Sequence, residues 1–351
     1  MELIRSSNID ETEYVRFLDR FAAAPGAALG YHYPFYLRFL AGPAYPSSGL
    51  RFVSARDDRG ALVGVVPAIH VRTARINAWL SLAYFGPNAG ALVPAGGTPE
   101  GASIVRALMA AAHADARDLG CGSMTLYTPL NAAIDPYRAG LGGADFEVER
   151  TSQYMPIPHD MSPWPRKVRY DVRRAKSLGL TVRPIEKEAD LDLMWEIYRA
   201  HCESHAIPVK PRDHVRCLFH TAGRHGVFLA AERDGELVAG LICFMGGGVL
   251  SFYLPCTRPD ARSLQPGLLL LDRAVAIGRD AGCRLFNFEG SPGVDGAVFR
   301  FKARCGGEPV QYHALIKLLR PGVLDEYRAL TPAGLAAEAP HAFLVPFDAL
   351  A

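Results

Sequence analysis

The residues best suited to chemistry lie in the segment 288–310, FEGSPGVDGAVFRFKARCGGEPV, where a glycine-rich turn precedes Lys302. Lysine is scarce in this chain, with six residues against thirty-two arginines, so a lysine at this place suggests a specific role. Phe299 and Phe301 alternate with Arg300 and Lys302, a pattern typical of a strand with one buried face. The preceding glycines would let a ligand approach the backbone closely. A cation there can bind a phosphate or stabilise charge that develops on oxygen.

Glu289 is the acid nearest to this lysine, at the end of the expected strand 284–290. A carboxylate in that position is a candidate general base for removing a proton from an attacking ammonium group. It is equally suited to cap the backbone amides of the residues that follow it. Lys302 also has two structural interpretations, as an exposed strand residue or as an ion-pair partner of Glu289 or Glu308.

A second feature is the basic segment 164–180, WPRKVRYDVRRAKSLGL, which has the pattern of an amphipathic helix. Pro165 suits its first turn and Gly179 suits its end. Only Asp171 offsets the charge, so pairing along the helix does not explain the cluster, which favours binding of phosphate or another polyanion. A solvated helix face is the alternative. Six residues of the segment are basic: Arg166, Lys167, Arg169, Arg173, Arg174 and Lys176.

The cysteines and histidines do not predict a metal site. Seven cysteines are scattered without a CxxC pair, as expected for reduced thiols in the cytoplasm. His201 and His205 have the i, i+4 spacing of a ligand pair, but no third ligand stands near them in the sequence. We therefore expect no bound metal.

Composition predicts a globular protein of two domains, because 351 residues exceed the roughly 100–200 residues of one domain. The net charge is +2, so any anion-binding surface must be local, and we expect no DNA binding. The first residues lack the basic and apolar regions of a signal peptide, and no stretch approaches the ~18 apolar residues of a membrane span. These observations favour a cytoplasmic location.

An internal repeat indicates how the elements that carry these residues are arranged. DDRGALVGVV at 57–66 matches RDGELVAGLI at 233–242, each a turn that leads into an apolar strand. HADARDLGCGSMTLY at 113–127 matches AIGRDAGCRLFNF at 276–288, each a helix end followed by a strand. The order strand, strand, helix, strand occurs in both halves, which favours two copies of one α/β unit.

The two units are expected to meet near residue 150, before the proline-rich stretch 152–165, which disfavours a helix. We place one domain at 1–150 and the other at 151–325. Residues 326–351 are rich in alanine and proline and are expected to pack as a C-terminal appendage.

In sequence order, several motifs of this chain resemble the FemA/FemB/FemX-like transferases, which carry two tandem GNAT-like (N-acetyltransferase-like) domains. The resemblance covers about residues 30–320 and implies an α/β fold in which each unit is a mixed sheet flanked by helices. The motifs are YPFYLRFL, SLAYFGPNAGALV, KVRYDVRRAKSLGLTVR, CTRPDARSLQPGLLLLDRAVAIGRDAGCRLFNFEG and VFRFKARCGGEPV.

The resemblance implies acyl transfer to an amine, with aminoacyl-tRNA as donor and no bound cofactor. The acceptor would be the amine of a cell-envelope precursor or a specialised metabolite. By motif position, catalysis at the acylated tRNA end falls on Lys302 with Phe301 beside it. By motif position, binding of the substrate phosphates falls on Arg166, Tyr170 and Tyr253. We expect Arg169 and Arg173, their neighbours on the basic helix, to take part in this binding.

The pyrophosphate loop of GNAT enzymes is poorly kept, since Gln265 replaces a glycine in the segment 262–267. This loss disfavours an acyl-CoA-dependent N-acyltransferase, but a helix still begins there and can bind an anion weakly, so this enzyme class stays an alternative. A non-catalytic scaffold is a third. In GNAT-like folds the gap between two splayed strands supplies N–H groups to the acyl carbonyl. The strand LICFMGGGVLSFYLP would form one wall of that gap, with a hairpin turn at 246–248.

Overall fold

One mixed sheet runs through the whole molecule, in the strand order β1-β2-β3-β4-β5-β12-β6-β11-β10-β9-β8-β7. The structure is a computed structural model that describes residues 1–42, 45–82, 90–94, 96–130, 132–160, 162–204, 209–291 and 293–350. The strands are β1 Glu2–Ser6, β2 Ser48–Arg56, β3 Leu62–Arg72, β4 Asn77–Ser81, β5 Ser123–Tyr127, β6 Phe146–Pro156, β7 Thr181–Pro184, β8 Gly226–Arg233, β9 Glu236–Gly246, β10 Val249–Thr257, β11 Leu285–Gly290 and β12 Glu308–Leu318. The α-helices are α1 Glu11–Asp19, α2 Pro34–Leu40, α3 Pro99–Asp118, α4 Asp135–Leu141, α5 Arg166–Ser177, α6 Glu188–Ser204, α7 Arg212–Thr221, α8 Pro266–Asp280, α9 Ala297–Arg304 and α10 Val323–Glu338.

The sheet consists of two equivalent halves that meet between β12 and β6. In each half the innermost pair of consecutive strands, β4 with β5 and β10 with β11, is parallel, whereas all other neighbours are antiparallel. The helix α3 connects the first parallel pair and α8 connects the second, so the two helices occupy equivalent places. The predicted duplication into two α/β units, each a mixed sheet flanked by helices, is confirmed.

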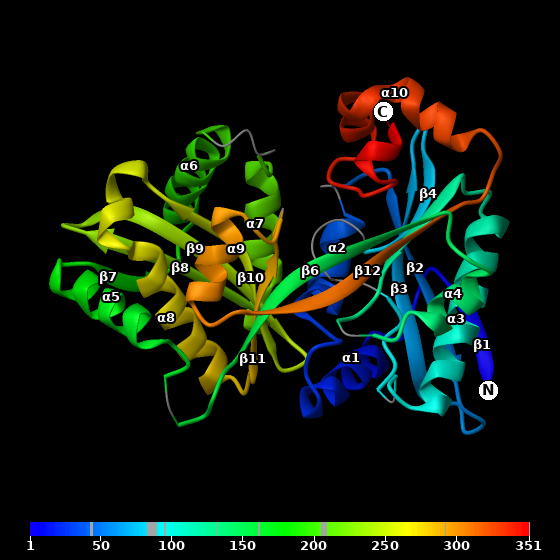
Figure 1. Ribbon diagram of the computed structural model, residues 1–351, viewed down its shortest axis with the longest axis horizontal. Coiled ribbons are helices and arrows are strands. Elements are labelled where there is room, and N and C mark those ends of the chain that lie inside the picture. The colour runs from blue at the N-terminus through cyan, green and yellow to red at the C-terminus, as the bar shows by residue number, and fades with distance from the viewer. Residues whose placement is uncertain are drawn as a thin grey trace.

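The two units exchange strands through β6 and β12, the long pair that crosses the centre of Figure 1. β6 leaves the first unit and pairs with β11 of the second, and β12 leaves the second unit and pairs with β5 of the first. The two strands pair with each other from Phe146 with Ile316 to Tyr154 with Glu308. The expected boundary at residue 150 thus falls inside a strand that both units share.

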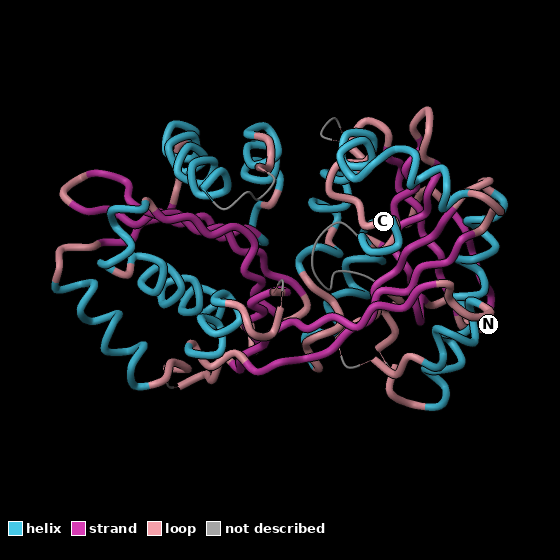
Figure 2. Tube along the Cα trace, turned by 45° about the horizontal axis from the view of Figure 1, so that its top comes forward, coloured by secondary structure: helices cyan, strands magenta, loops and turns pink. Residues whose placement is uncertain are grey.

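Helices cover both faces of each half of the sheet, as Figure 2 shows most clearly for the second unit. α3 and α4 bury one face of the first unit, and α5 and α8 bury one face of the second. The opposite faces share one apolar core that includes α1, α2, α6 and α7. Within this core, Gly30 of a short 3-10 helix lies against Phe244 of β9.

The segment around Lys302 differs from the expected strand, because residues 297–304 form the two-turn helix α9. Phe299 is half-buried while Lys302 and Cys305 are buried, so sheltered positions recur every three residues, the spacing of a helix. The alternation that favoured a strand extends over only four residues. This length is too short to distinguish the two-residue period of a strand from the 3.6-residue period of a helix.

Two other local predictions are confirmed. The basic segment forms α5, with Val168, Val172 and Ala175 buried. Residues 246–248 turn the hairpin from β9 to β10, and Gly247 and Gly248 have φ values of 55° and 76°. Such left-handed backbone is accessible to glycine without strain.

The C-terminal residues pack on the first unit. Tyr327 of α10 hydrogen-bonds Ser123 through its hydroxyl at 2.8 Å, and Thr125 donates to the carbonyl of Leu344 at 3.0 Å. Phe343 and Val345 are buried beside these contacts. Across the part of the chain that is described, no helix combines the length and apolar character that a bilayer crossing requires.

The close contact at Gly30 gives a test of the shared core. A methyl group at this position would lie 2.8 Å from the Cβ of Phe244, whereas one at Gly49 of β2 meets nothing within 4 Å. Gly30→Ala should lower the free energy of unfolding by about 1–3 kcal/mol, as overpacking does. Gly49→Ala is the control and should change it by less than about 0.5 kcal/mol. Urea unfolding measures both, and equal effects would contradict the close packing of the units.

Candidate active site

The candidate site lies where β10 and β11 separate. These strands pair only from Val249 with Leu285 to Ser251 with Asn287, although β10 continues to residue 257. A bulge at Tyr253 shifts the register of β10 against β9 at the same place. The edge of β10 that faces β11 has no strand pairing beyond Ser251 among the described residues, so its N–H groups can donate to a ligand carbonyl.

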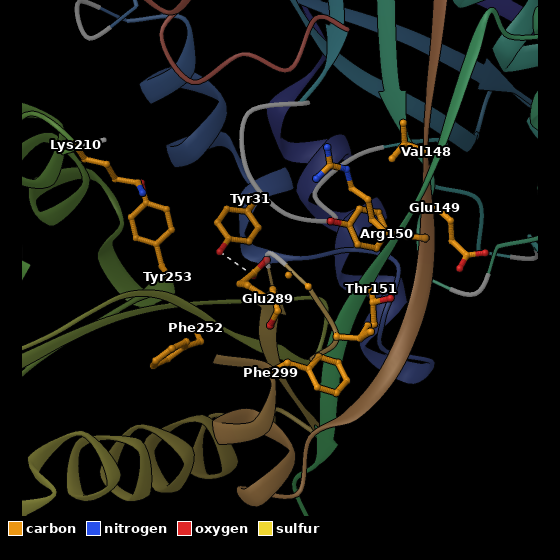
Figure 3. Close-up of a pocket in the computed structure, with 15 residues that line it drawn as sticks. Tyr31, Val148, Glu149, Arg150, Thr151, Lys210, Phe252, Tyr253, Glu289 and Phe299 are labelled. Carbon is orange, nitrogen blue, oxygen red and sulfur yellow. Dashed lines mark hydrogen bonds between the residues drawn. The ribbon is translucent and has the colours of Figure 1, made fainter. Parts of the chain in front are cut away.

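A pocket of about 610 Å³ opens on one side of this gap, between the two units, and is called the interlobe pocket below. Figure 3 shows Glu289 near its centre, with Tyr31 and Tyr253 on one side and Arg150 on the other. Its volume falls within the range of small-molecule sites. The lining residues are Tyr31, Val148, Glu149, Arg150, Thr151, Lys210, Phe252, Tyr253, Glu289, Gly290, Ser291, Gly293, Val294, Phe299 and Tyr312.

Glu289 is held by hydrogen bonds from both units. Its Oε1 accepts from the Tyr31 hydroxyl at 2.9 Å and from the Asn287 amide at 2.7 Å. The Asn287 side chain also accepts from the backbone N–H of Glu289 at 2.8 Å. The backbone there is left-handed, with φ of 64°, which is rare for a residue other than glycine and marks a constrained position. Burial raises the pKa of Glu289 to about 8, against the opposing effects of the Tyr31 hydrogen bond and the Lys302 charge.

Lys302 supports the chain turn that carries Glu289. Its Nζ donates to the backbone carbonyls of Glu289 and Gly290, at 2.8 and 2.7 Å. The side chain is only 3% exposed, and burial lowers its pKa to about 8, while the nearby Glu289 charge opposes the shift. Lys302 is not an exposed strand residue, because it is buried on the helix α9. Its hydrogen-bond partners are the two backbone carbonyls.

Aromatic side chains surround the carboxyl group. The Tyr253 ring contacts Tyr31 and Tyr36 at centroid distances of 6.1 and 6.3 Å. The Nζ of Lys210 lies 5.3 Å from the centroid of the Tyr253 ring, and burial lowers the pKa of this lysine to about 8. The wall is therefore largely apolar, with cationic groups at its margin. Its apolar part accounts for the desolvation of Glu289.

A second cavity of about 520 Å³, called the helix cleft below, lies beside the first turn of α8. Apolar side chains make up most of its wall, and Arg262 and Gln265 lie at the start of the helix. Since the first N–H groups of a helix favour anions, this end can hold a phosphate near an apolar cleft. The lining residues are His201, Gly240, Leu241, Phe252, Pro255, Cys256, Thr257, Arg262, Gln265, Pro266, Gly267, Leu268, Leu270, Leu271, Ala297, Val298, Phe301 and Lys302.

The two cavities are adjacent. Phe252 of β10 lines both of them, and α9 contributes Phe299 to the interlobe pocket but Phe301 and Lys302 to the helix cleft. A donor in one cavity and an acceptor in the other could therefore meet beside the unpaired edge of β10. This arrangement suits transfer of a group between two bound molecules.

The predicted site residues fall into two groups. Glu289, Lys302, Phe301 and Tyr253 come together around β11 and α9. The residues of α5 lie elsewhere, because this helix packs with α8 on one face of the sheet whereas Tyr253 packs against the shared core on the other. Tyr170 is 51% exposed, and its neighbours Arg166, Arg169 and Arg173 are exposed as well. The binding role assigned to α5 remains a prediction about a separate surface.

Sequence reasoning missed four residues around Glu289 and the interlobe pocket. Tyr31, Arg150, Asn287 and Tyr312 stand in ordinary apolar or charged runs, and no spacing rule connects them. The one available signal was Asn287, because an Asn two residues before Glu289 can bond the backbone locally. Among the described residues no cluster of three potential metal ligands occurs, and His205 lies outside them.

Comparisons with known proteins identify the fold. Residues 165–303 match the family described as Acetyltransferase (GNAT) domain. The crystal structure of FemX has a TM-score of 0.71, with 12% identity over 89% of this chain and 97% of that chain. The chain has a FemX-type tandem GNAT fold.

Two further solved structures are similar to this chain over most of its length. A tandem GNAT protein from the clavulanic acid biosynthesis pathway has a TM-score of 0.53 at 16% identity, covering 91% of this chain and 99% of that chain. L-PGS from Bacillus licheniformis has a TM-score of 0.51 at 13% identity, with coverages of 94% and 97%. The comparison with curated sequences gives no match. The second unit is therefore a domain of the GNAT acyltransferase type, in a tandem arrangement.

The contacts of Lys302 predict a structural effect of its removal. Lys302→Met leaves two sheltered carbonyls without a donor and should lower the free energy of unfolding by about 2–4 kcal/mol. Lys317 is a matched control, because its Nζ also donates to two consecutive carbonyls, of Gly142 and Gly143, but at an exposed place. Lys317→Met should cost less than about 1 kcal/mol. Similar losses for the two variants in urea unfolding would show that burial of the Lys302 contact is unimportant.

Proposed function

We propose that this protein transfers an acyl group to an amine, with the donor in the helix cleft and the acceptor in the interlobe pocket. The observation that carries the proposal is the half-buried Glu289 carboxyl group, which lines the interlobe pocket beside the gap between β10 and β11 and has its pKa raised to about 8 by desolvation. A base with a pKa near neutrality is matched to removing a proton from an ammonium group. The unpaired edge of β10 supplies donors for the acyl oxygen.

The reaction follows from this arrangement. The Glu289 carboxylate takes a proton from the acceptor ammonium, and the neutral amine attacks the acyl carbonyl to form a new C–N bond. Negative charge develops on the carbonyl oxygen, where N–H groups of β10 stabilise it. The bond from carbon to the leaving oxygen or sulfur then breaks, and the leaving group takes up the second proton, which the attacking nitrogen loses as the amide forms. Lys302 keeps the turn at Glu289 in place through the two backbone carbonyls.

For the donor we propose aminoacyl-tRNA, as the resemblance to FemX implies. The exposed basic face of α5 supports this assignment, because it offers an extended positive surface on the same unit as the helix cleft. Arg166, Arg169 and Arg173 have no ion-pair partner within the part of the chain that the structure covers. Their charges are therefore available to a phosphodiester backbone.

An acyl-CoA donor is the second candidate, and the apolar wall of the helix cleft favours it. A thioester with an apolar acyl chain would bury that chain against the leucines of α8. The solved structure of the tandem GNAT protein from the clavulanic acid pathway is that of its form without AcCoA. AcCoA is therefore a ligand to test with a similar fold. The two donors are distinguished by experiment.

The role of Glu289 predicts a pH dependence. Because the base acts when deprotonated and its pKa is raised from 4.5 to about 8, kcat/KM should rise with pH and level off above about 8. Glu289→Gln keeps a similar shape and should lower kcat by about 10²–10⁴-fold. Glu308→Gln is the control, since Glu308 is an exposed acid at the start of β12. An undiminished rate in Glu289→Gln would rule out this base.

The donor assignment predicts different effects of α5 on the two candidates. Loss of the acyl group is followed with a pool of charged tRNAs and, separately, with acyl-CoAs. Arg169→Ala combined with Arg173→Ala should raise KM for charged tRNA about tenfold or more in 150 mM salt, since each charge-assisted phosphate contact contributes about 1.5–3 kcal/mol. The pair Arg320→Ala and Arg328→Ala, on the first unit, is the control. Turnover of acyl-CoA alone, unaffected by the α5 changes, would establish the second candidate.

A further inference from the structure

The interlobe pocket has a second charged group, Arg150, on the wall across from Glu289 (Figure 3). Arg150 comes from the middle of β6, the strand that runs from the first unit into the second. In the view Tyr31 lies on the side of Glu289 away from Arg150, and its hydroxyl donates to the Glu289 carboxyl group. The pocket therefore offers an acidic group and a basic group to one bound molecule.

Two rings hold the Arg150 guanidinium in place. Its central carbon lies 4.4 Å from the centroid of the Phe343 ring and 5.9 Å from that of Tyr127. Both rings are buried, with exposures of 8% and 4%. Cation–π contacts of this kind restrict a long side chain without neutralising its charge.

The charge of Arg150 has no protein counterion in the described part of the chain. No carboxylate there lies within ion-pair distance, and the buried Nε atom makes no hydrogen bond. The nearest acids in sequence have other partners. Glu147 pairs with Arg138 at 2.7 Å, and Glu149 accepts from Gln311 at 2.8 Å while its side chain points away from Arg150.

An unpaired, sheltered guanidinium is a binding site for an anion that it can contact with two parallel hydrogen bonds. A carboxylate matches the planar fork of arginine in this way. Leaving the buried Nε without a partner costs free energy, which a bound carboxylate would recover. The cavity volume of about 610 Å³ accommodates a small molecule that reaches from one charged wall to the other.

We propose that the acceptor is an amino acid or an amino-acid-like metabolite, with its amine beside Glu289 and its carboxylate on Arg150. The proposal rests on the acyl transfer described above and names the acceptor class for the same site. The rings of Phe252, Tyr253 and Phe299 line the remaining wall, so the acceptor side chain is apolar or aromatic. Arg150 is then a residue that determines specificity, and Glu289 acts on the amine of the same molecule.

The test compares amino acids with the amines that lack their carboxylate, such as phenylalanine with phenethylamine and leucine with isoamylamine. Wild-type protein should bind the amino acid at least tenfold more tightly in calorimetry, and transfer should show the same preference in KM with little change in kcat. Arg150→Gln should remove the preference, and Arg150→Lys should retain part of it. Arg138→Gln is the control, because Arg138 is an exposed arginine already paired with Glu147 and outside the pocket.

Each outcome decides the proposal. Equal affinity of wild-type protein for the amino acids and their decarboxylated amines would overturn it, whatever the variants do, and this comparison still decides if Arg150→Gln fails to fold. Transfer to amines without any dependence on the carboxylate would overturn it while leaving acyl transfer intact. Amino-acid binding that needs Arg150, with no transfer from any donor, would support the subsite and contradict the proposed function instead.

Discussion

The exchange of β6 and β12 is the constraint on which the rest of the structure depends. Each unit completes its sheet with a strand that the chain delivers on its way into or out of the other unit. The seam between the units is thus made of paired backbone rather than of a mobile linker. A pocket built across such a seam keeps its two walls at a fixed separation, as a site that aligns two reactants requires.

The chemistry at the seam depends on a compromise between burial and charge. Glu289 is surrounded by tyrosines and apolar side chains, which oppose its ionisation, yet Tyr31 and Asn287 donate to it and Lys302 lies beneath its backbone. These donors keep the carboxyl group oriented in either protonation state. A group that is oriented but easily protonated can accept a proton and release it again within one cycle.

The fold could be predicted from the sequence to a considerable extent because its signals are local and repeated. The hairpin at 246–248 follows from consecutive glycines, α5 from its apolar spacing, and the duplication from matching turns and helix ends. The strand exchange could not be predicted, since no local pattern specifies which edge a strand pairs with. Only the resemblance suggested that distant residues share a site, and it grouped Tyr253 with α5, whereas the structure places them on opposite faces of the sheet. Tyr31 and Arg150 could not be found from the sequence because their contacts are with residues distant in the chain, Glu289 for Tyr31 and Phe343 for Arg150.

The packing of β12 and the C-terminal residues on the first unit has a consequence for synthesis on the ribosome. The inner edge of β5 stays open until residues 308–318 have emerged, because β12 is its partner there. Phe343, which lies over Arg150, is made later still. The unit made first is therefore the last to be completed, and the nascent chain must shield an unpaired strand edge while the entire second unit is translated.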